Sequence, residues 1–531
     1  MEKMKTEKRR EEIKAIVNSD DSCRQKLFFK GFLLSDDEQI NCEDYPFFGK
    51  WKKTILENGM FVLSHPETKL TTVRNSGGRV ACLIGHAFDP VSGKILETDL
   101  LQEVLKTETD DDLFDRINEW TGVYSLILIF ENGIRMLNDP VGLQSVFYTS
   151  ACSHFYASSH SNLIGDLLGL QVSSYVERLK RAPTFHFFGN QLPGNITQFS
   201  EVFRLNPNHY LTCGAVSVQK RFYHPKNLPL SEEEICDSLI NIMTNTMKMI
   251  PQKWSKPAIS LTGGCDSKTT LACAKAYWDK YRFFSYDSQK HEVPDMKAAD
   301  TICKALSLDL IKYRIPYSDA EFDGIENLRE IFWWNGGDIL ANNPNDVRKR
   351  VFLDRVQDFD IEVKSWASEV GRSRYTKHYD GRVNFGKRPS PRTCTTFYKF
   401  LFFNRILVNQ TDRVFKAYLE RYFEPDPDRP IPWQDQFYWE WHWPSRDGIT
   451  LTCEQLFSND ITVPYNNRKI LELLLSVPEE GRITDRIYAR IRQKLEPGID
   501  RACLGVTDAN HTARRAKLEN LYYIFNRLLV F

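Results

Sequence analysis

The segment Ile259–Ser267, with the sequence ISLTGGCDS, carries the side chains of this chain that are best suited to chemistry. It reads as an apolar strand that feeds a glycine pair and then a helix. Glycines let the backbone approach an anion closely, and the free N–H groups at a helix start point toward it. Thr262 and Ser267 add hydroxyl donors. The segment therefore predicts a phosphate-binding loop at the end of a strand.

Asp266 within this loop indicates a metal ion as well, because a carboxylate repels a phosphate unless a divalent cation lies between them. The P-loop pattern does not fit, since Ser267 and not a glycine precedes Lys268. A left-handed turn between strand and helix would explain the glycines, but not the Asp-Ser pair that follows. Lys268 either contacts phosphate or is a solvated helix lysine.

The elements around the loop predict a parallel sheet. Strands are expected at 257–261, 281–286 and 310–315, with helices at 268–278 and 294–306 between them. This alternation indicates a doubly wound α/β unit, whose ligand site should lie at the carboxyl ends of the strands. Ser231 and Glu234 form a capping box that starts a helix before the first strand. Beyond about residue 325 the chain is expected to be mostly helical.

The first part of the chain has a different pattern of predicted secondary structure. From residue 27 to about 214 it reads mostly as short strands, including 80–88, 123–130 and a strand–turn–strand at 134–150. A helical stretch is expected around residues 100–120, with Asp110, Asp111 and Asp112 as cap candidates. The pattern predicts a layered α/β sheet unit. Two prolines at 224–230 mark a linker, so we expect domains at 1–222 and 231–531.

Composition excludes several classes of protein. The 531 residues include 70 Lys+Arg and 70 Asp+Glu, so no overall positive field attracts nucleic acid. Apolar runs reach about five residues, far short of the roughly 20 of a membrane span. The charged segment 1–14 does not resemble a secretory signal, and twelve cysteines without a CxxC indicate reduced thiols in a cytoplasmic protein. The aromatic run 432–446 is expected to pack in a core rather than to stack on bases.

A family resemblance enters at the loop. The residues 262–267, TGGCDS, resemble the SGGxDS loop of the ATP-pyrophosphatase superfamily, with threonine in place of the first serine. Three later stretches, 293–299, 368–375 and 463–472, resemble segments of its asparagine-synthetase-like branch. In the last of them the family's aspartate has become asparagine.

The first part of the chain resembles the class II glutamine amidotransferase domain of the same family. The similar stretches are Cys82–His86, Trp120–Tyr124, Asn138–Leu143, Val146–Tyr148 and Tyr156–Ser159. The resemblance covers roughly residues 27–500, in collinear order. It implies an α/β fold with an Ntn-hydrolase-like αββα sandwich, followed by a doubly wound parallel-sheet ATP-pyrophosphatase domain with a helical C-terminal part.

The chain departs from this family at the glutaminase nucleophile, a cysteine at the mature N-terminus whose own amine acts as base. This chain starts with Met1, Cys23 lacks the small residues that follow the family's cysteine, and Cys42 lies too deep. Ile84 stands where the family has an oxyanion-hole asparagine. We therefore expect the first domain to lack glutaminase activity and to serve as a packing partner, as in the β-lactam synthetases and lasso-peptide cyclases of the family.

The resemblance implies an AMP-forming carbon–nitrogen ligase that uses ATP and Mg²⁺. Its substrates would be a small-molecule or peptide carboxylate and an amine, without nucleic acid or membrane, and a homodimer is left open. Arg486 stands near the family's lysine and is either catalytic or a surface helix charge. The expected residues are Asp266, Glu369 and Arg486 for catalysis, Asp266 and Glu369 for the metal, and Leu261, Thr262, Gly263, Gly264, Asp266, Ser267, Lys268 and Tyr286 for ATP.

Two other functions stay open at this point: a glutamine-dependent asparagine-synthetase-type enzyme, and a catalytically silent nucleotide-binding or scaffold protein. A basic stretch at 371–392 either clamps an anionic substrate or is a solvated loop. Its members are Arg372, Arg374, Lys377, Arg382, Lys387, Arg388 and Arg392.

Overall fold

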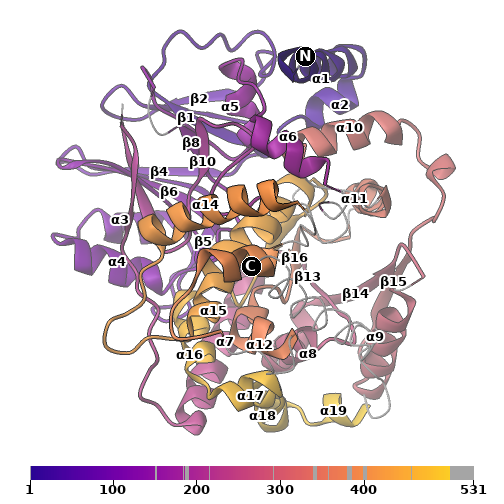
Figure 1. The fold of residues 1–531 in the computed structure, drawn as a ribbon. Helices are drawn as coiled ribbons and strands as arrows, with labels where there is room; N and C mark the ends of the chain where they lie inside the picture. Colours follow the sequence, from indigo (N-terminus) through magenta and orange to yellow (C-terminus); the bar gives the residue numbers. More distant parts are fainter. Residues whose placement is uncertain are drawn as a thin grey trace.

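The computed structural model has a mixed α/β fold with two antiparallel sheets of six strands and one parallel sheet of five (Figure 1). This confirms the predicted fold class in its coarse form. The residues that the structure describes are 2–149, 152–182, 185, 191–214, 216–290, 292–338, 344–356, 358–378, 385–398, 404–455 and 457–502.

The two antiparallel sheets are built from the first part of the chain, as predicted. The first has the order β10-β8-β9-β1-β3-β2, and the second has the order β12-β11-β7-β6-β5-β4. The strands of the first sheet are β1 Phe32–Ser35, β2 Lys52–Ile55, β3 Phe61–Ser64, β8 Phe147–Thr149, β9 Tyr156–Ser158 and β10 Val202–Arg204. Those of the second are β4 Leu70–Arg74, β5 Val80–Phe88, β6 Thr121–Phe130, β7 Gly133–Asn138, β11 His209–Cys213 and β12 Val218–Arg221.

Alternation along β5 shows how these sheets are layered. Cys82 and Ile84 face a core shared with Leu34 of the first sheet, whereas Ala81 and Leu83 face helices. Those helices are α3 (Glu97–Val104) and α4 (Asp110–Asn118), at the left of Figure 1. Helix α5 (Ser161–Leu167) covers strands of the first sheet from the other side. The layers are therefore helix, sheet, sheet and helix.

The helical stretch expected at 100–120 is two helices. The cap of α4 is Thr109, whose hydroxyl accepts a hydrogen bond from the backbone N–H of Asp112 at 3.1 Å. The cap prediction for Asp110, Asp111 and Asp112 is therefore wrong. These carboxylates occupy the first turn, where they stabilise the positive end of the helix dipole.

The five-stranded sheet is parallel throughout and has the order β15-β14-β13-β16-β17. Since β13 comes first in the chain, the order reverses between β13 and β16. At such a switch point the loops after the two strands diverge and leave a crevice at the carboxyl ends. The strands are β13 Pro257–Ser260, β14 Arg282–Asp287, β15 Leu310–Arg314, β16 Ile361–Val363 and β17 Asp460–Thr462.

Helices of this part start close to their predicted positions. Helix α7 (Glu232–Lys253) begins with the expected capping box, in which the Ser231 hydroxyl accepts from the Glu234 N–H at 3.3 Å. Helix α8 (Cys265–Cys273) starts three residues earlier than predicted, directly after the glycine pair, and α9 (Val293–Ala305) follows β14. Beyond residue 325 the chain is mostly helical, as expected, but β16 and β17 were not predicted.

The remaining helices complete the fold around the three sheets. The aromatic run lies in α15 and the following π-helix η4, where Trp439, Trp441 and Trp443 are buried, which confirms that it packs in a core. Among the described residues no helix combines the length and the apolar character needed to cross a bilayer. These helices are α1 Glu2–Ser19, α2 Asp21–Lys26, α6 Ser174–Lys180, η1 Lys275–Lys280, η2 Asp319–Glu321, α10 Ile325–Asn335, α11 Pro344–Arg355, η3 Ser368–Arg372, α12 Arg374–His378, α13 Pro391–Tyr398, α14 Arg405–Tyr422, α15 Trp433–Phe437, η4 Tyr438–Gly448, η5 Leu451–Gln455, α16 Arg468–Ser476, α17 Glu479–Ile483, α18 Arg486–Leu495 and α19 Gly498–Ala502.

Two asparagines after β17 fasten the parallel sheet to the antiparallel layers. The Asn466 amide donates to the Gly122 carbonyl at 2.6 Å and to Asp139 at 2.9 Å. The Asn467 amide donates to the Glu119 carbonyl at 2.7 Å. One hydrophobic cluster also runs through both parts of the chain. The boundary between 1–222 and 231–531 stays a prediction.

Candidate functional site

The predicted phosphate loop leaves the carboxyl end of β13 and folds over the first turn of α8. Leu261 still pairs with β14, since its N–H donates to the Phe284 carbonyl at 2.8 Å. The Thr262 hydroxyl accepts from the Gly264 N–H at 3.1 Å, and the Ser267 hydroxyl donates to the Thr262 carbonyl at 3.1 Å. These short-range hydrogen bonds fix the conformation of the loop.

The glycine pair is required for close packing and not for a left-handed turn. Gly264 has φ −66° and ψ 154°, and Gly263 does not have a positive φ either. The left-handed-turn explanation is therefore wrong. A Cβ atom on Gly263 would lie 3.0 Å from the Cβ of Ala298 on α9. The Gly263 N–H donates to Asp295 on the same helix at 3.3 Å. Because no side chain caps α8, its first N–H groups can bind a ligand.

Two carboxyl groups converge at the switch point of the sheet. Asp266 lies in the first turn of α8, and Glu369 lies in η3, which follows β16. One oxygen of each, Oδ1 of Asp266 and Oε2 of Glu369, is buried without a hydrogen-bond partner. Burial and the charge of Asp266 raise the pKa of Glu369 to about 8, and burial also raises the pKa of Asp266.

This carboxyl pair fits a magnesium ion by the chemistry of its donors. Hard divalent cations bind oxygen ligands, and Mg²⁺ usually takes one or two carboxylates and completes its shell with water and phosphate. The orphaned oxygens of Asp266 and Glu369 offer such a pair. Within the described ranges, no group of three or more His, Cys, Asp or Glu side chains could hold a metal ion by itself. A cation here would therefore depend on ligands that a bound phosphate brings.

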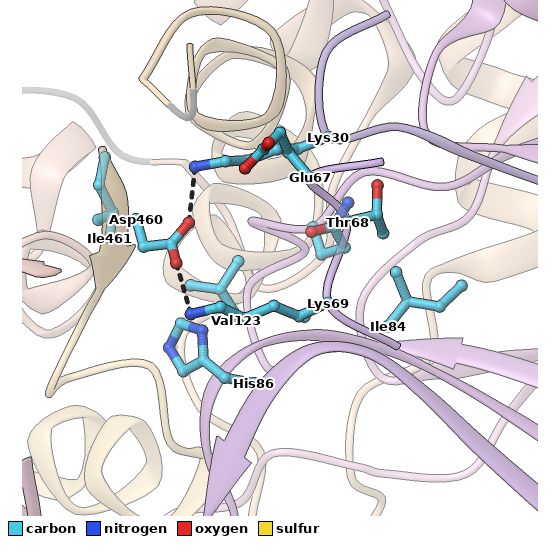
Figure 2. Close-up of a pocket in the computed structure, with 11 residues that line it drawn as sticks. Lys30, Glu67, Thr68, Lys69, Ile84, His86, Val123, Asp460 and Ile461 are labelled. Carbon is cyan, nitrogen blue, oxygen red and sulfur yellow. Dashed lines mark hydrogen bonds and ion pairs between the residues drawn. The ribbon is translucent and has the colours of Figure 1, made fainter. Parts of the chain in front are cut away.

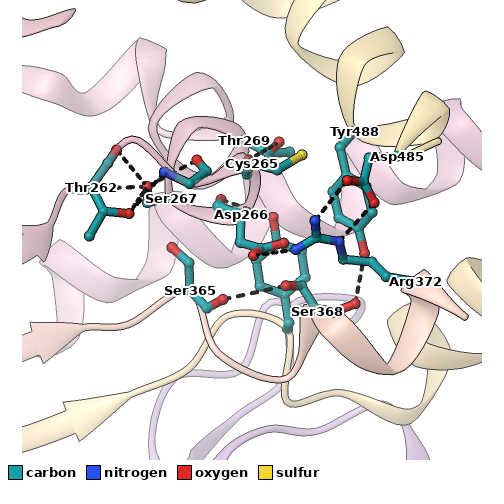
Figure 3. A network of polar contacts seen from close by, with 12 residues as sticks. Thr262, Cys265, Asp266, Ser267, Thr269, Ser365, Ser368, Arg372, Asp485 and Tyr488 are labelled. Carbon is teal, nitrogen blue, oxygen red and sulfur yellow. Dashed lines mark hydrogen bonds and ion pairs between the residues drawn. The ribbon is translucent and has the colours of Figure 1, made fainter. Parts of the chain in front are cut away.

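Arg372 supplies the positive charge at this pair (Figure 3). Its Nη1 donates to Asp266 Oδ2 at 3.0 Å, and its Nε and Nη2 form a two-bond pair with Asp485 at 2.8 and 2.7 Å. Lys377 donates to the same Asp485 carboxylate at 3.0 Å. The three segments that carry Asp266, Arg372 and Asp485 are thus joined by one guanidinium.

Helix α18 braces both loops of the site. The Tyr488 hydroxyl donates to the Ser368 carbonyl at 2.8 Å, and Arg492 donates to the Thr269 hydroxyl on α8 at 2.9 Å. On the far side of η3, a Cβ atom on Gly371 would lie 2.5 Å from the Cβ of Leu474. A glycine at this position is what allows η3 to pack against α16.

Arg486 does not join the carboxyl pair. Its guanidinium pairs with Glu232 at the start of α7, at 2.9 and 2.8 Å, and no contact with Asp266 or Glu369 exists among the described residues. The catalytic role predicted for Arg486 stays a prediction without support from its contacts. Arg372 occupies the place at the carboxyl pair that Arg486 was expected to take.

The other predicted ligand residues flank the loop. Lys268 is half-buried in the first turn of α8 and makes no ion pair within the described part of the chain. Tyr286 lies near the carboxyl end of β14, and the Lys349 ammonium sits 4.7 Å from the centre of its ring. Lys268 thus follows the loop after β13, and Tyr286 lies on the neighbouring strand β14.

The basic stretch does not act as one unit. Arg372 and Lys377 enter the site, whereas Arg392 pairs with Asp412 and Lys387 and Arg388 are exposed. Arg382 lies outside the described residues. Sequence reasoning missed Asp485, Tyr488 and Arg492, and it named Arg372 only as part of the basic stretch. The position of Arg372, one turn after Glu369, was the available signal.

A second polar cluster lies where β5 and β6 meet β17 (Figure 2). The Asp460 carboxylate binds Lys30 through one oxygen and Lys69 through the other, both at 2.6 Å. Gly85 has φ +99°, and a side chain there would collide with the Val123 carbonyl. His86 is buried and its Nε2 has no hydrogen-bond partner. The residues of this cluster line a cavity, and no cysteine is among the residues that line it.

Cys23 has no features of an activated nucleophile. It lies in α2 with its side chain fully buried, and burial together with Asp20 raises the pKa of its thiol to about 12. A thiol acts as a nucleophile through its thiolate form. A buried and protonated Cys23 is therefore not placed to act as a nucleophile in this structure.

Comparisons with known proteins add little. No protein-family model matches the chain, and no curated protein matches it. Among solved structures, the chain is similar to the allosteric regulatory enzyme of purine biosynthesis, at 10% identity and a TM-score of 0.24 over 58% of this chain and 83% of that one. It is also similar to glutamine phosphoribosylpyrophosphate amidotransferase from B. subtilis complexed with ADP and GMP, at 11% identity and 0.24 over 58% and 84%. Such TM-scores are too low to assign a family or an activity.

Replacing Asp460 with asparagine should destabilise the fold, because Lys30 and Lys69 lose the carboxylate between them. We expect the free energy of unfolding at pH 7 to fall by about 1–3 kcal/mol in urea denaturation. Lys69→Gln is the matched control, since Lys69 is 56% exposed and should cost less than about 1 kcal/mol. Equal losses in the two variants would contradict this account of Asp460.

Glu369→Gln should raise stability at alkaline pH. The pKa of Glu369 rises from 4.5 to about 8 on folding, so folding favours its protonated form. That contribution is fully present below pH 4.5 and is lost as the pH rises through 8. We expect the variant to exceed the native protein by roughly 2 kcal/mol or more at pH 8.5, and by little at pH 4.5.

Urea denaturation across this pH range measures the effect of Glu369→Gln. Glu480→Gln, at a side chain that is 85% exposed, is the control and should show no such pH dependence. A constant difference between native protein and Glu369→Gln at all pH values would show that Glu369 does not titrate in this range.

Proposed function

We propose that this protein is an ATP-dependent, AMP-forming ligase that adenylates a carboxylate and joins it to an amine, without glutaminase activity of its own. The observation that carries the proposal is the pair Asp266 and Glu369, which interact electrostatically in the segments that follow β13 and β16 and which each keep one buried oxygen without a hydrogen-bond partner. Nucleotides bind at the switch points of doubly wound folds. The resemblance of residues 262–267 to the ATP-pyrophosphatase loop supports the same function.

The loop and its surroundings supply the parts that ATP requires. The phosphates would bind Thr262, Gly263, Gly264 and Ser267 together with the first N–H groups of α8, and Lys268 would add a charge. Leu261 and Tyr286 would border the nucleoside, at the ends of neighbouring strands. Bound Mg²⁺, held by Asp266 and Glu369, would neutralise charge on the phosphates.

The proposed reaction has two steps, adenylation of the carboxylate and formation of the amide. A carboxylate oxygen of the substrate attacks the α-phosphorus, the bond to pyrophosphate breaks, and an acyl-adenylate forms. The amine nitrogen then attacks the acyl carbon, AMP leaves with the bonding electrons, and the nitrogen gives up a proton. Arg372 is the residue best placed to stabilise negative charge that develops at the reacting phosphate, because its guanidinium already reaches Asp266.

The antiparallel layers fit the role of a packing partner in this enzyme. We infer an amidotransferase-like domain that has lost its nucleophile, because Cys23 is buried in α2 and the cavity beside Gly85 holds Lys30 and Asp460. The amine would then reach the second step directly and not as ammonia released from glutamine.

One observation favours a second candidate, a nucleotide-binding protein without catalysis. The guanidinium of Arg372 occupies Asp266 Oδ2, which a cation would also seek. If this ion pair persists when a nucleotide binds, the Asp266 carboxylate is only partly available to a metal ion. The two candidates differ in whether pyrophosphate is released.

The test is pyrophosphate release from Mg–ATP in the presence of the small-molecule fraction of a cell extract. Native protein should release pyrophosphate, and Asp266→Ala should lower the rate by about a hundredfold or more. Asp279→Ala, at a side chain that is 68% exposed, is the matched control and should keep the native rate.

The outcome that would sink the proposal is a folded Asp266→Ala variant with the native rate. Binding of Mg–ATP in calorimetry without release of pyrophosphate for any fraction would favour the second candidate instead.

A further inference from the structure

A second cavity, of about 550 Å³, lies where α2 meets the segments 46–51 and 65–67. Its volume falls in the range of sites for small organic molecules, roughly 300–1,000 Å³. Asp354 and Ser458 close it from the other part of the chain. None of residues 261–267 lines it, so it is separate from the proposed nucleotide site.

Aromatic rings form one wall of this cavity. The His65 ring packs edge-to-face with Phe29 at 5.0 Å and with Trp51 at 5.9 Å between ring centroids. Its Nε2 lies 3.1 Å from the Gln25 carbonyl, and its Nδ1 accepts from the Glu67 N–H at 3.1 Å. Both nitrogens are therefore engaged, and His65 presents only ring surface. The aromatic residues of the wall are Phe29, Phe47, Phe48, Trp51 and His65.

The cavity also carries excess positive charge, part of it against the aromatic rings, since the Lys26 ammonium lies 4.1 Å from the centre of the Phe29 ring and the Arg24 guanidinium 5.1 Å from that of Phe48. Lys50 and Arg24 share one carboxylate, Asp21, which is 59% exposed and lies 3.4 and 3.6 Å from them. Lys26 pairs with Asp354, and Lys30 shares Asp460 with Lys69. The charged residues of the cavity and their ion-pair partners together comprise five cations and four carboxylates, which leaves one excess positive charge. The cations are Arg24, Lys26, Lys30, Lys50 and Lys69, and the carboxylates are Asp21, Glu67, Asp354 and Asp460.

Backbone strain gathers at the same place. Phe28, Lys30 and Phe48 have φ of 48°, 52° and 52°, in the left-handed region that bulky side chains avoid. Phe28 and Lys30 flank Phe29, so the strained turn presents the Phe29 ring to the cavity. Backbone strain of this kind is concentrated at ligand sites.

We propose that this cavity is a binding site for a small organic anion that carries a flat ring. The ring would pack among Phe29, Phe48 and Trp51, beside the cations that lie over Phe29 and Phe48, and the carboxylate or phosphate group would bind Lys50, whose ammonium lies 3.4 Å from the exposed Asp21. Burial, with the charges of Lys26 and Lys30, lowers the pKa of His65 to about 4, so the wall stays uncharged at pH 7. This proposal does not depend on the ligase activity.

The test uses four probes on the full chain, followed by saturation-transfer NMR and calorimetry. Benzoate and phenyl phosphate carry both a ring and an anion, benzamide carries the ring alone, and inorganic phosphate carries the anion alone. We expect the first two to bind at least about tenfold more tightly than the last two. The stronger of benzoate and phenyl phosphate identifies the anionic group that the site prefers.

Two charge-reversal variants locate the binding. Lys50→Glu should weaken the better probe by about tenfold or more. Lys52→Glu carries the same change on β2 at an exposed residue outside the cavity and should bind as the native protein does. Thermal melts of both variants check that they fold. Equal affinity of all four probes, no binding by 10 mM, or native affinity in Lys50→Glu would overturn the proposal.

Discussion

The structure depends on two carboxyl groups, Asp266 and Glu369, which are buried so close together that burial and the charge of Asp266 keep Glu369 protonated near pH 7. Asp266 and Glu369 come from loops 103 positions apart in sequence, yet the charge of Asp266 helps to raise the pKa of Glu369. Only one cation, Arg372, reaches Asp266 among the described residues. Removing carboxylates from water is costly unless they are paired and hydrogen-bonded. A protein that keeps such a pair, with one oxygen of each unsatisfied, gives up stability for a function.

The elements around Asp266 and Glu369 hold these two side chains in position. The switch point between β13 and β16 separates the two loops, and Arg372 ties them to α18 through Asp485. Asn466 and Asn467 fasten the neighbouring strand β17 to the antiparallel layers. The antiparallel layers thus contact the parallel-sheet part through hydrogen bonds and a shared hydrophobic cluster.

Local sequence patterns were enough to predict much of the parallel sheet. The strands β13 to β15 and the helices α7 to α9 have clear apolar periods and caps. The strands β16 and β17 have three residues each, too short for an alternating pattern, and β16 contains the buried Glu362. Their places are set by pairing with β13 and with each other across the chain. The glycine pair was identified correctly, but the need for Gly263 lies in the close approach of α9.

The arginine at the site shows the limit of the same reasoning. Asp485 and Arg486 are adjacent, but Asp485 precedes α18 with a left-handed backbone (φ 56°), whereas Arg486 is the first residue of the helix, so their side chains point in different directions. Asp485 therefore meets Arg372, whereas Arg486 meets Glu232. The family resemblance of this segment identifies the stretch of chain that lies near the site. It does not decide whether Asp485 or Arg486 points toward Arg372. The pairing of Arg372 with Asp485 spans 113 residues and is a result of the tertiary fold.

The central claim is that Asp266 and Glu369 together hold the cation of a bound nucleotide. The most direct measurement is proton release when Mg²⁺ and a non-hydrolysable ATP analogue bind at pH 7, from calorimetry in buffers of different ionisation enthalpy. Since the pKa of Glu369 is about 8, the native protein should release about one proton more than Glu369→Gln, after the protons that the analogue itself loses on binding Mg²⁺ are subtracted. Tight binding to the native protein without this additional proton release would contradict the claim.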